Sequence, residues 1–255
     1  MYGYYQPDGY RQLITIKCPD HMKRDDFNDW IVDHAQREKY VPGLRWYTVC
    51  FTFNTIDYSD GSPGLPVKFD VFEEMYFSSL KDLKGAYGSD VMHKELYFMA
   101  EKGLMEPDIF NGLWAEANII KMKGLTSPPK QKNCARIFGG CRRTKEMSKK
   151  DLKDWYHSHA ERVIDEEGKM IIPEIIGYTH NFSLDDSPFG IPFIDAYCNN
   201  WWASIEDMFK TFSGDIWRGQ LEHREDHIDA YDKSFFIGAL ATEHIVDLPN
   251  RSSSS

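Results

Sequence analysis

This sequence has few cysteines, and none of them form a closely spaced pair along the chain. The five cysteines are an odd number, are widely scattered and include no Cys-x-x-Cys pair: Cys18, Cys50, Cys134, Cys141 and Cys198. A disulfide framework or a zinc knuckle needs cysteines paired at characteristic spacings, so neither is indicated. We therefore expect ordinary buried thiols, and we assign no metal-binding residue.

Long hydrophobic runs and an excess of positive charge are also missing. No apolar stretch approaches the roughly 20 residues that span a bilayer, and the opening MYGYYQPDGY lacks a basic segment followed by an apolar one. The formal net charge is -10, whereas nucleic-acid-binding proteins gain much of their affinity from clustered lysines and arginines. We expect a cytoplasmic protein that binds neither membrane nor nucleic acid.

Two familiar catalytic motifs are absent. The segment Phe138-Gly139-Gly140-Cys141 lacks the spacing of a phosphate-binding loop and the Lys-Ser/Thr that follows one. The nucleophile elbow G-x-S-x-G does not occur either. Nucleotide-driven chemistry and serine hydrolysis are therefore disfavoured.

An internal repeat is present in the chain. The segment Asp25–Ala35 aligns with Lys150–Ala160, and Trp30 then matches Trp155 at an offset of 125 residues. With 255 residues, the chain is long enough for two units of about 100 to 150 residues each. We expect one repeat over residues 1–123, a linker rich in Pro, Ser and Lys over 124–133, and a second repeat over 134–255.

Two further segments extend the repeat. Trp46-Tyr47-Thr48 matches Gly177-Tyr178-Thr179 at an offset of 131, and Phe77–Leu83 matches Trp202–Met208 at 125 again. Each copy has the pattern strand, helix, strand, strand, helix, strand. The strands are expected near 12–16, 44–54, 70–76 and 113–121 in the first copy, and near 135–138, 174–182, 193–199 and 235–245 in the second. The second helices are expected at about 78–102 and 204–231, with breaks at Gly88 and Gly214.

The first helix of each copy carries an aromatic stripe that must face a sheet. Its members recur at helical spacing, as Phe27, Trp30, Ile31 and His34 in one copy and Leu152, Trp155, Tyr156 and His159 in the other. Two aromatic sets on the later elements are most simply core, with a stacked planar ligand as the alternative: Phe69, Phe72, Tyr76 and Phe77, then Tyr197, Trp201 and Trp202.

The pattern D-x-x-x-W-x-x-x-H-A, a proline, a strand with Tyr, and an aromatic-Ser/Ala-Ser segment occurs twice and resembles the EthD-like family of the dimeric α/β-barrel superfamily. The resemblance implies an α+β fold of two ferredoxin-like repeats, whose antiparallel sheets pack face to face as a barrel within one chain. It also implies a substrate cavity beside the first helices. Such a barrel can pair further into a homodimer.

Members of that superfamily include decarboxylases, dehydratases, cyclases and lactone isomerases that use no cofactor and act on aromatic or polyketide-like compounds. Several use a histidine from the first helix, where His34 and His159 are placed here. The resemblance thus predicts a His/Tyr acid–base lyase without a cofactor. An isomerase or cyclase, a haem-dependent enzyme with an axial histidine, and a non-catalytic small-molecule binder remain alternatives.

The second copy is predicted to hold the better-equipped site. Tyr178 and His180 lie two apart on one strand and share a face with Phe182, and with His159 they would supply a phenol and imidazoles. The first copy offers only Tyr47 and His34, the second choice. Four aromatic side chains are predicted to contact the substrate: Trp30, Trp155, Phe182 and Trp202. The alternative for each histidine is a purely structural role, as a core residue that is hydrogen-bonded to a backbone carbonyl.

Two histidine pairs are considered as metal ligands, and neither is assigned as a metal site. His157 and His159 lie roughly 200° apart around a helix and point in opposite directions. His223 and His227 have better spacing, but their segment is mostly charged and is more simply a solvated helix face.

Overall fold

The computed structural model describes residues 9–54, 69–119, 134–161, 171–214 and 237–249. In chain order, the strands and helices are β1 Gly9–Ile16, α1 Arg24–Glu38, β2 Leu44–Asn54, β3 Val71–Phe77, α2 Leu80–Tyr87, α3 Asp90–Glu101, β4 Phe110–Ile119, β5 Cys134–Cys141, α4 Lys149–Glu161, β6 Ile175–Ser183, β7 Ala196–Trp202, α5 Ile205–Phe212 and β8 Ile237–Ile245. No helix in this part of the chain is long and apolar enough to cross a membrane. The predicted linker 124–133 and the His223/His227 pair lie outside the described residues.

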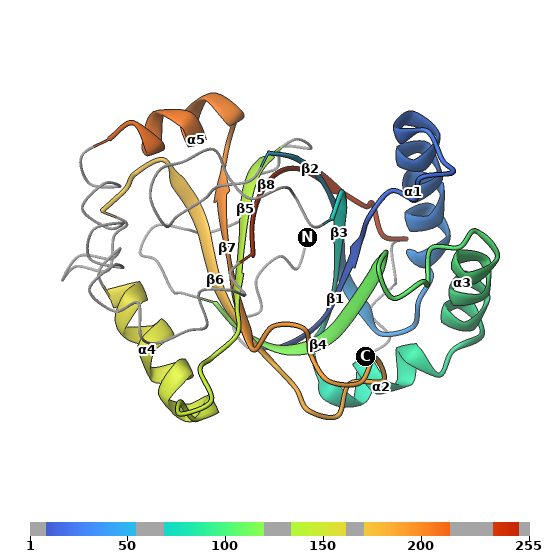
Figure 1. The fold of residues 1–255 in the computed structure, drawn as a ribbon, viewed down its shortest axis with the longest axis horizontal. Helices are drawn as coiled ribbons and strands as arrows, with labels where there is room; N and C mark the ends of the chain where they lie inside the picture. The colour runs from blue at the N-terminus through green and yellow to red at the C-terminus, as the bar shows by residue number, and fades with distance from the viewer. Residues whose placement is uncertain (1–8, 55–68, 120–133, 162–170, 215–236, 250–255) are drawn as a thin grey trace.

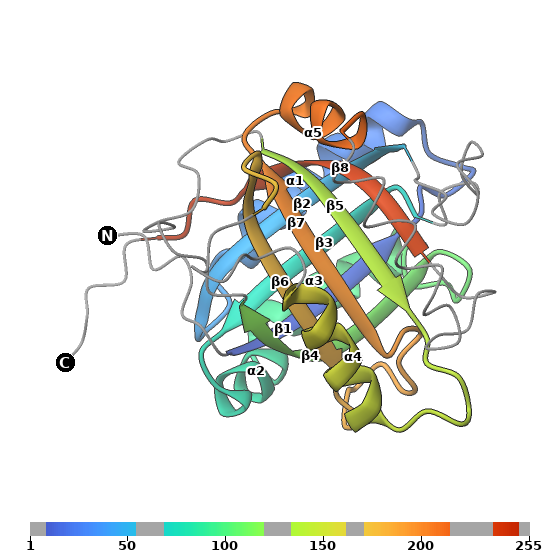
Figure 2. The ribbon, with the colours of Figure 1, turned by 90° about the vertical axis from the view of Figure 1, so that its left-hand side faces the viewer.

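The strands form one closed antiparallel barrel in the order β1-β3-β2-β8-β5-β7-β6-β4. Helices α1, α2 and α3 cover one side of the barrel, and α4 and α5 cover the opposite side (Figure 1). The view from that second side places α4 in front of β6 and β7 (Figure 2). The α+β class expected from the sequence is confirmed.

The two halves of the chain have the same strand order. Reading along the barrel gives β4-β1-β3-β2 for the first half and β8-β5-β7-β6 for the second. The halves are joined by two strand pairs, β2 with β8 and β4 with β6. The antiparallel barrel within one chain that the sequence predicted is observed, and its two sheets are hydrogen-bonded to each other at both edges, which leaves no open sheet edge among these strands.

The strand registers also coincide between the halves. Arg11 lies opposite Tyr76 in the β1–β3 pair, and Arg136 lies opposite Trp201 in the β5–β7 pair, each 125 residues further on. The β2–β3 pair shifts register between Leu44 and Trp46, and the β6–β7 pair shifts at the corresponding place.

Matching serine caps begin the helices that follow β3 and β7. The Ser79 side chain accepts a hydrogen bond from the Asp82 backbone N–H at 3.1 Å, and Ser204 accepts one from Asp207 at 3.1 Å. A cap of this kind satisfies an N–H that has no partner within the helix. The break predicted at Gly88 is confirmed, because α2 ends at Tyr87 and α3 begins at Asp90.

Strand boundaries were predicted with uneven accuracy. The β2 bounds are confirmed exactly at 44–54, but β7 runs over 196–202 instead of the predicted 193–199. The apolar Phe193 and Ile194 favoured an earlier start. Asp195 instead accepts a hydrogen bond from the Arg143 N–H at 3.0 Å, which ties this stretch to the loop after β5.

The barrel interior is packed with side chains. One cluster joins residues from seven of the eight strands, all fully buried, and includes Leu13, Cys50, Phe72, Leu113, Phe138, Tyr197 and Ala239. The aromatic sets predicted as core are buried as expected. The side chains of His34 and His180 lie outside this packed interior, between the sheet and the helices α1 and α4.

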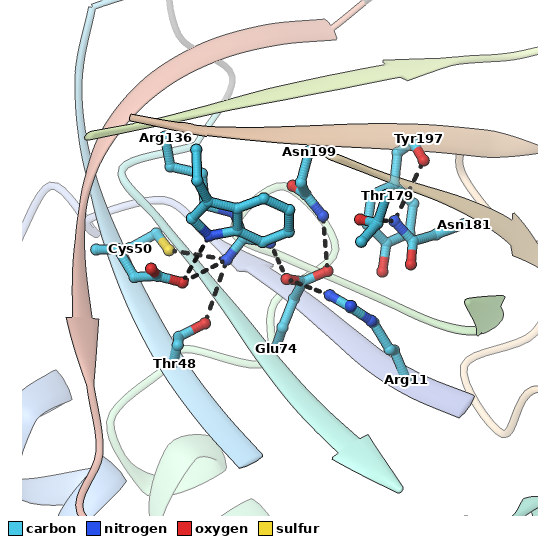
Figure 3. A network of polar contacts seen from close by, with 11 residues as sticks. Arg11, Thr48, Cys50, Glu74, Arg136, Thr179, Asn181, Tyr197 and Asn199 are labelled. Atoms are coloured by element: carbon cyan, nitrogen blue, oxygen red, sulfur yellow. Dashed lines mark hydrogen bonds and ion pairs between the residues drawn. The ribbon is translucent and has the colours of Figure 1, made fainter. Parts of the chain in front are cut away.

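A buried ion network lies beside this apolar cluster (Figure 3). Glu74 on β3 forms ion pairs with Arg11 at 3.2 Å and with Arg136, and it accepts a hydrogen bond from Asn199 Nδ2 at 3.2 Å. Arg136 also reaches Glu243 at 3.1 Å. Burial alone would raise the pKa of Glu74, but the two guanidinium groups hold it below its ordinary value.

Candidate functional site

Two polar clusters lie between the sheet and the helices, one in each half of the chain. In the first half, α1 carries His34 on its buried face, directed at β3 and α3. Two acidic residues in the first turn, Asp25 and Asp26, and Arg37 in the last turn favour this helix through its dipole. The Trp30 ring stacks on the His34 ring with centroids 4.9 Å apart and planes 13° apart.

His34 is held between carboxylates at both ring nitrogens. Its Nδ1 lies 2.9 Å from Glu95 Oε2 on α3. Its Nε2 lies 3.2 Å from Glu38 Oε2, one helical turn along α1, and 3.9 Å from Glu73 Oε2 on β3. All four side chains are buried. We call this set, together with Tyr47, the carboxylate cluster.

Tyr47 joins the two carboxylates that face His34 Nε2. Its hydroxyl lies 2.7 Å from Glu38 Oε2 and 3.1 Å from Glu73 Oε2. A single O–H can donate only one strong hydrogen bond, so the arrangement favours a proton on one of the two carboxyl groups. Burial raises the pKa of Glu73 to about 7, while the charge of His34 opposes that rise.

The carboxylate cluster fixes the charge of His34. Burial alone would lower its pKa, but the charge and hydrogen bond of Glu38, the hydrogen bond of Glu95 and the charge of Glu73 raise it to about 10. At neutral pH this imidazole therefore stays protonated. A general base works best with a pKa near the operating pH, so His34 is poorly suited to exchange protons with a substrate.

The second half has an imidazole-centred cluster instead. His180 and Tyr178 project from the same face of β6, with ring centroids 4.7 Å apart. Tyr156 and His157 on α4 face His180 at 5.0 Å and 5.9 Å, and Phe182 lies at 6.4 Å. We call these five residues the histidine–tyrosine cluster.

The start of α4 positions this cluster. Ser148 Oγ accepts a hydrogen bond from the Asp151 N–H at 3.1 Å, and the Asp151 side chain accepts one from the Ser148 N–H at 3.2 Å. The Tyr156 hydroxyl lies 3.2 Å from Cys141 Sγ on β5. His180 is fully buried, whereas His157 is half-buried. His157 is thus a partly exposed imidazole beside the fully buried one.

The structure brings together some of the predicted site residues and not others. Tyr178, His180 and Phe182 share one face as predicted, and His34 and Tyr47 meet through Glu38. His159 lies on α4, but its side chain is outside the described part.

Among the predicted ring contacts, Trp30 lies on His34 and Trp155 on Tyr156, with ring centroids 5.0 Å apart in the second pair. Trp202 lies apart from these rings. It is fully buried beneath α5, where its Nε1 donates a hydrogen bond to Thr211 Oγ1 at 2.9 Å. The structure does not place it beside His180, since Trp202 lies opposite Ile175 at the far end of β6.

Sequence reasoning missed five residues of the two clusters. Glu38, Glu73 and Glu95 were not considered, although Glu73 and Glu74 are adjacent acids in an otherwise apolar strand, a signal that was available. Tyr156 was treated only as part of a core stripe, and His157 was weighed only as a metal ligand.

Comparison with known proteins identifies the architecture. No family model and no curated protein matches the chain. Among solved structures, an anthrone oxidase-like protein shares 11% identity, covering all of this chain and 97% of its own, with a TM-score of 0.59. Candidate monooxygenases from Fusobacterium nucleatum and Lactobacillus acidophilus share 10% and 7% identity over 97% and 95% of this chain, and 96% and 100% of their own, with TM-scores of 0.54 and 0.52.

The chain has a dimeric α/β-barrel, ferredoxin-like fold. At such low identity the comparison establishes the fold alone. The haem-dependent alternative left open by the sequence requires an axial histidine. Both nitrogens of His34 face carboxylates, and four aromatic rings surround His180 within 6.4 Å. Neither environment, within the described residues, suits a porphyrin face.

Proposed function

We propose that this protein is a small-molecule enzyme that moves protons between a substrate and the histidine–tyrosine cluster. The observation that carries the proposal is the pairing of Tyr178 with His180 on one face of β6, with His157 facing the same imidazole from α4. A phenol can hold a carbonyl or phenolate oxygen while a histidine removes or returns a proton. His159 remains a candidate for the same role.

The reaction class follows from these parts. Removing a proton beside a carbonyl gives an enolate whose oxygen the phenol stabilises. Dehydration follows when the β-hydroxyl leaves as water, protonated by the imidazolium, and isomerisation follows when the proton returns at another carbon. In a decarboxylation, loss of carbon dioxide from a β-keto acid leaves the enolate, and its protonation completes the reaction. We infer a lyase that uses no cofactor, of the decarboxylase or dehydratase type, with isomerase or cyclase chemistry as the variant that needs the same groups. The aromatic rings of Tyr156, Phe182 and Trp155 in and beside this cluster favour an aromatic or polyketide-like substrate.

The first half is not expected to perform this chemistry. Position 49 corresponds to His180 at the repeat offset of 131 and is occupied by Val49, and His34 is held as a cation by its carboxylates. We infer that the two halves arose by duplication of one ferredoxin-like unit of EthD-like origin and then diverged. The shared strand order and the matching registers support that inference.

A second candidate reaction is oxidation by dioxygen, which the similar solved structures suggest. Two are candidate monooxygenases and one is anthrone oxidase-like. An enzyme of that kind would consume dioxygen while oxidising a phenolic substrate. Tyr178 and His180 could deprotonate the phenol, so both candidates assign the same cluster.

A substrate panel distinguishes these candidates. Purified protein would be incubated with aromatic β-keto acids, aromatic β-hydroxy ketones and anthrone, with products followed by mass spectrometry and oxygen by an electrode. Loss of carbon dioxide or water without oxygen uptake is expected for the lyase, whereas uptake matching substrate loss would establish the oxidase. If wild-type protein converts compounds of the panel no faster than heat-inactivated protein, the proposed substrate class is rejected.

A further inference from the structure

The carboxylate cluster of the first half has the composition of a metal site. His34 Nε2, one oxygen of Glu38 and one oxygen of Glu73 lie within 4.8 Å of one another and are buried. They come from α1 and β3, so the set joins a helix to the sheet beneath it. None of these residues belongs to the histidine–tyrosine cluster.

The distances between the donor atoms are close to those around a bound cation. Metal bonds of about 2.0 to 2.2 Å place neighbouring ligand atoms roughly 3 to 3.6 Å apart. The observed separations from His34 Nε2 are 3.2 Å to Glu38 and 3.9 Å to Glu73. The Tyr47 hydroxyl, 2.7 Å and 3.1 Å from the same two carboxylate oxygens, adds a fourth donor atom and the third oxygen. Small side-chain movements would complete a four-coordinate site.

Unpartnered buried atoms are a second, independent indication of a ligand. Glu38 Oε1 and Glu73 Oε1 have no hydrogen-bond partner among the described residues, and both residues are only 1% exposed. An ionised carboxylate oxygen without a partner in a dry interior is costly. A cation held by these carboxylates would offset that cost.

We propose that His34, Glu38 and Glu73, with Tyr47 as the fourth donor, bind one divalent transition-metal ion. The negative charge around the site exceeds the positive charge. Three carboxylates lie there, including that of Glu95, and two cationic side chains, those of His34 and Arg37. The metal takes the position of the Nε2 proton of His34, which leaves to solvent on binding.

Glu95 is the positioning residue of the proposed site. Its Oε2 lies 2.9 Å from His34 Nδ1, and Arg37 Nε donates to its Oε1 at 2.9 Å. A carboxylate on the far ring nitrogen is the usual companion of a metal-bound histidine, because it fixes the ring orientation and raises the basicity of the ligating nitrogen. One nitrogen and two or three oxygens suit Zn²⁺, Mn²⁺, Fe²⁺ or Co²⁺ better than Mg²⁺ or Ca²⁺, which prefer oxygen alone.

The second half lacks the two carboxylates of the proposed site at the corresponding sequence positions. At the repeat offset of 125, the positions of Glu38 and Glu73 correspond to Val163 and Cys198, neither of which carries a carboxylate. One metal ion per chain is therefore expected. The site is sealed and lies in the other half from the proposed acid–base cluster, so the inference does not rest on the proposed function.

The test is metal binding by the full chain stripped with a chelator. Zn²⁺ and Mn²⁺ binding would be measured by calorimetry, and Co²⁺ by its visible absorption, with Mg²⁺ and Ca²⁺ in parallel. The variants are His34→Gln, Glu38→Gln and Glu73→Gln, which preserve side-chain size. The matched controls are His93→Gln and Glu101→Gln on α3, both exposed.

We expect one transition-metal ion per chain, a Co²⁺ spectrum of a low-coordinate site, and no comparable Mg²⁺ or Ca²⁺ binding. Loss of a single direct ligand should weaken binding at least about 100-fold, the upper end of what loss of an outer-sphere partner costs. The control variants should bind like wild type. Equal binding by wild type and the three ligand variants would overturn the proposal, and so would no binding at all.

A structural readout keeps the test decisive if a ligand variant fails to fold. Wild-type crystals soaked in Zn²⁺ or Mn²⁺ would be measured at the absorption edge of the metal. An anomalous peak between α1 and β3, beside His34, supports the site. A peak only at surface histidines, an adventitious ion only, contradicts it.

Discussion

Arg11 and Arg136, 125 residues apart in the sequence, both pair with the same oxygen of one carboxylate, Glu74 Oε2. One arginine comes from β1 and the other from the corresponding strand of the second half, β5. All three side chains are almost completely buried, at 2% exposure or less. A single acid therefore links both halves of the barrel at its centre.

Replacing Glu74 with Gln should destabilise the protein strongly. Among the described residues, the change leaves Arg136 with one ion pair, to Glu243, and removes the ion pair of Arg11; breaking a buried ion pair by removing one partner typically costs about 3 to 5 kcal/mol. Urea unfolding followed by circular dichroism would measure the loss. A matched quadruple variant, Arg11→Met, Glu74→Leu, Arg136→Met and Glu243→Gln, should recover much of it, since every charge of the network is then removed together. A loss below about 1 kcal/mol for Glu74→Gln would contradict the role given to this carboxylate.

The stability difference between wild type and Glu74→Gln should depend on pH. The neighbouring arginines lower the pKa of Glu74 in the folded protein relative to its ordinary value of 4.5. The contribution of this group is therefore fully present above pH 4.5 and disappears as the pH falls through the lower folded value. Urea midpoints of both proteins between pH 7 and pH 3 should converge at the acid end. A constant difference over this range would argue against the ion pairs.

The two serine caps should be energetically equivalent. Ser79 and Ser204 occupy corresponding positions and each accepts one hydrogen bond from a helix N–H at 3.1 Å. Replacing either serine with alanine should cost about 1 kcal/mol. Urea unfolding of Ser79→Ala and Ser204→Ala would test this, with Ser213→Ala at the other end of α5 as the control. A loss confined to one half would show that the two caps do not contribute equally.

Thiol reactivity should separate the five cysteines into two classes. Cys18 and Cys198 are partly exposed, whereas Cys50, Cys134 and Cys141 are buried. Burial raises the pKa of Cys134 to about 12 and that of Cys50 higher still, so neither forms a thiolate at pH 9. Native protein should release at most two equivalents of thionitrobenzoate from Ellman's reagent at pH 8, and five after unfolding in guanidinium. Rapid native modification of Cys50 or Cys134, detected by peptide mass spectrometry, would contradict the barrel packing.

The sequence was sufficient for the architecture because its strongest signals are local or repeated. Alternation and the Pro42-Gly43 turn located β2 to the residue, and the recurrence of Trp30 at Trp155 pointed to two similar halves. The face-to-face arrangement was inferred from a resemblance. It missed the β2–β8 and β4–β6 pairs, because strand pairing between distant segments has no signature in either strand alone.

The candidate sites were harder to predict for a related reason. Glu73 and Glu74 are adjacent, yet on a strand they face opposite sides, so one joins His34 beneath the helices and the other joins Arg136 inside the barrel. Their partners lie 39 and 62 residues away in the chain. The helical geometry that was used to separate His157 from His159 did not reveal that His157 faces the sheet.

The most direct test of the account is the turnover of an identified substrate by His180→Gln and Tyr178→Phe. Exposed His93→Gln and Tyr97→Phe on α3 are the matched controls. General acid–base catalysis typically contributes about 10²- to 10⁴-fold, so kcat should fall at least about 100-fold in the first two variants and remain unchanged in the controls. If His180→Gln and Tyr178→Phe fold, by circular dichroism, and retain wild-type kcat, the histidine–tyrosine cluster is not the active site.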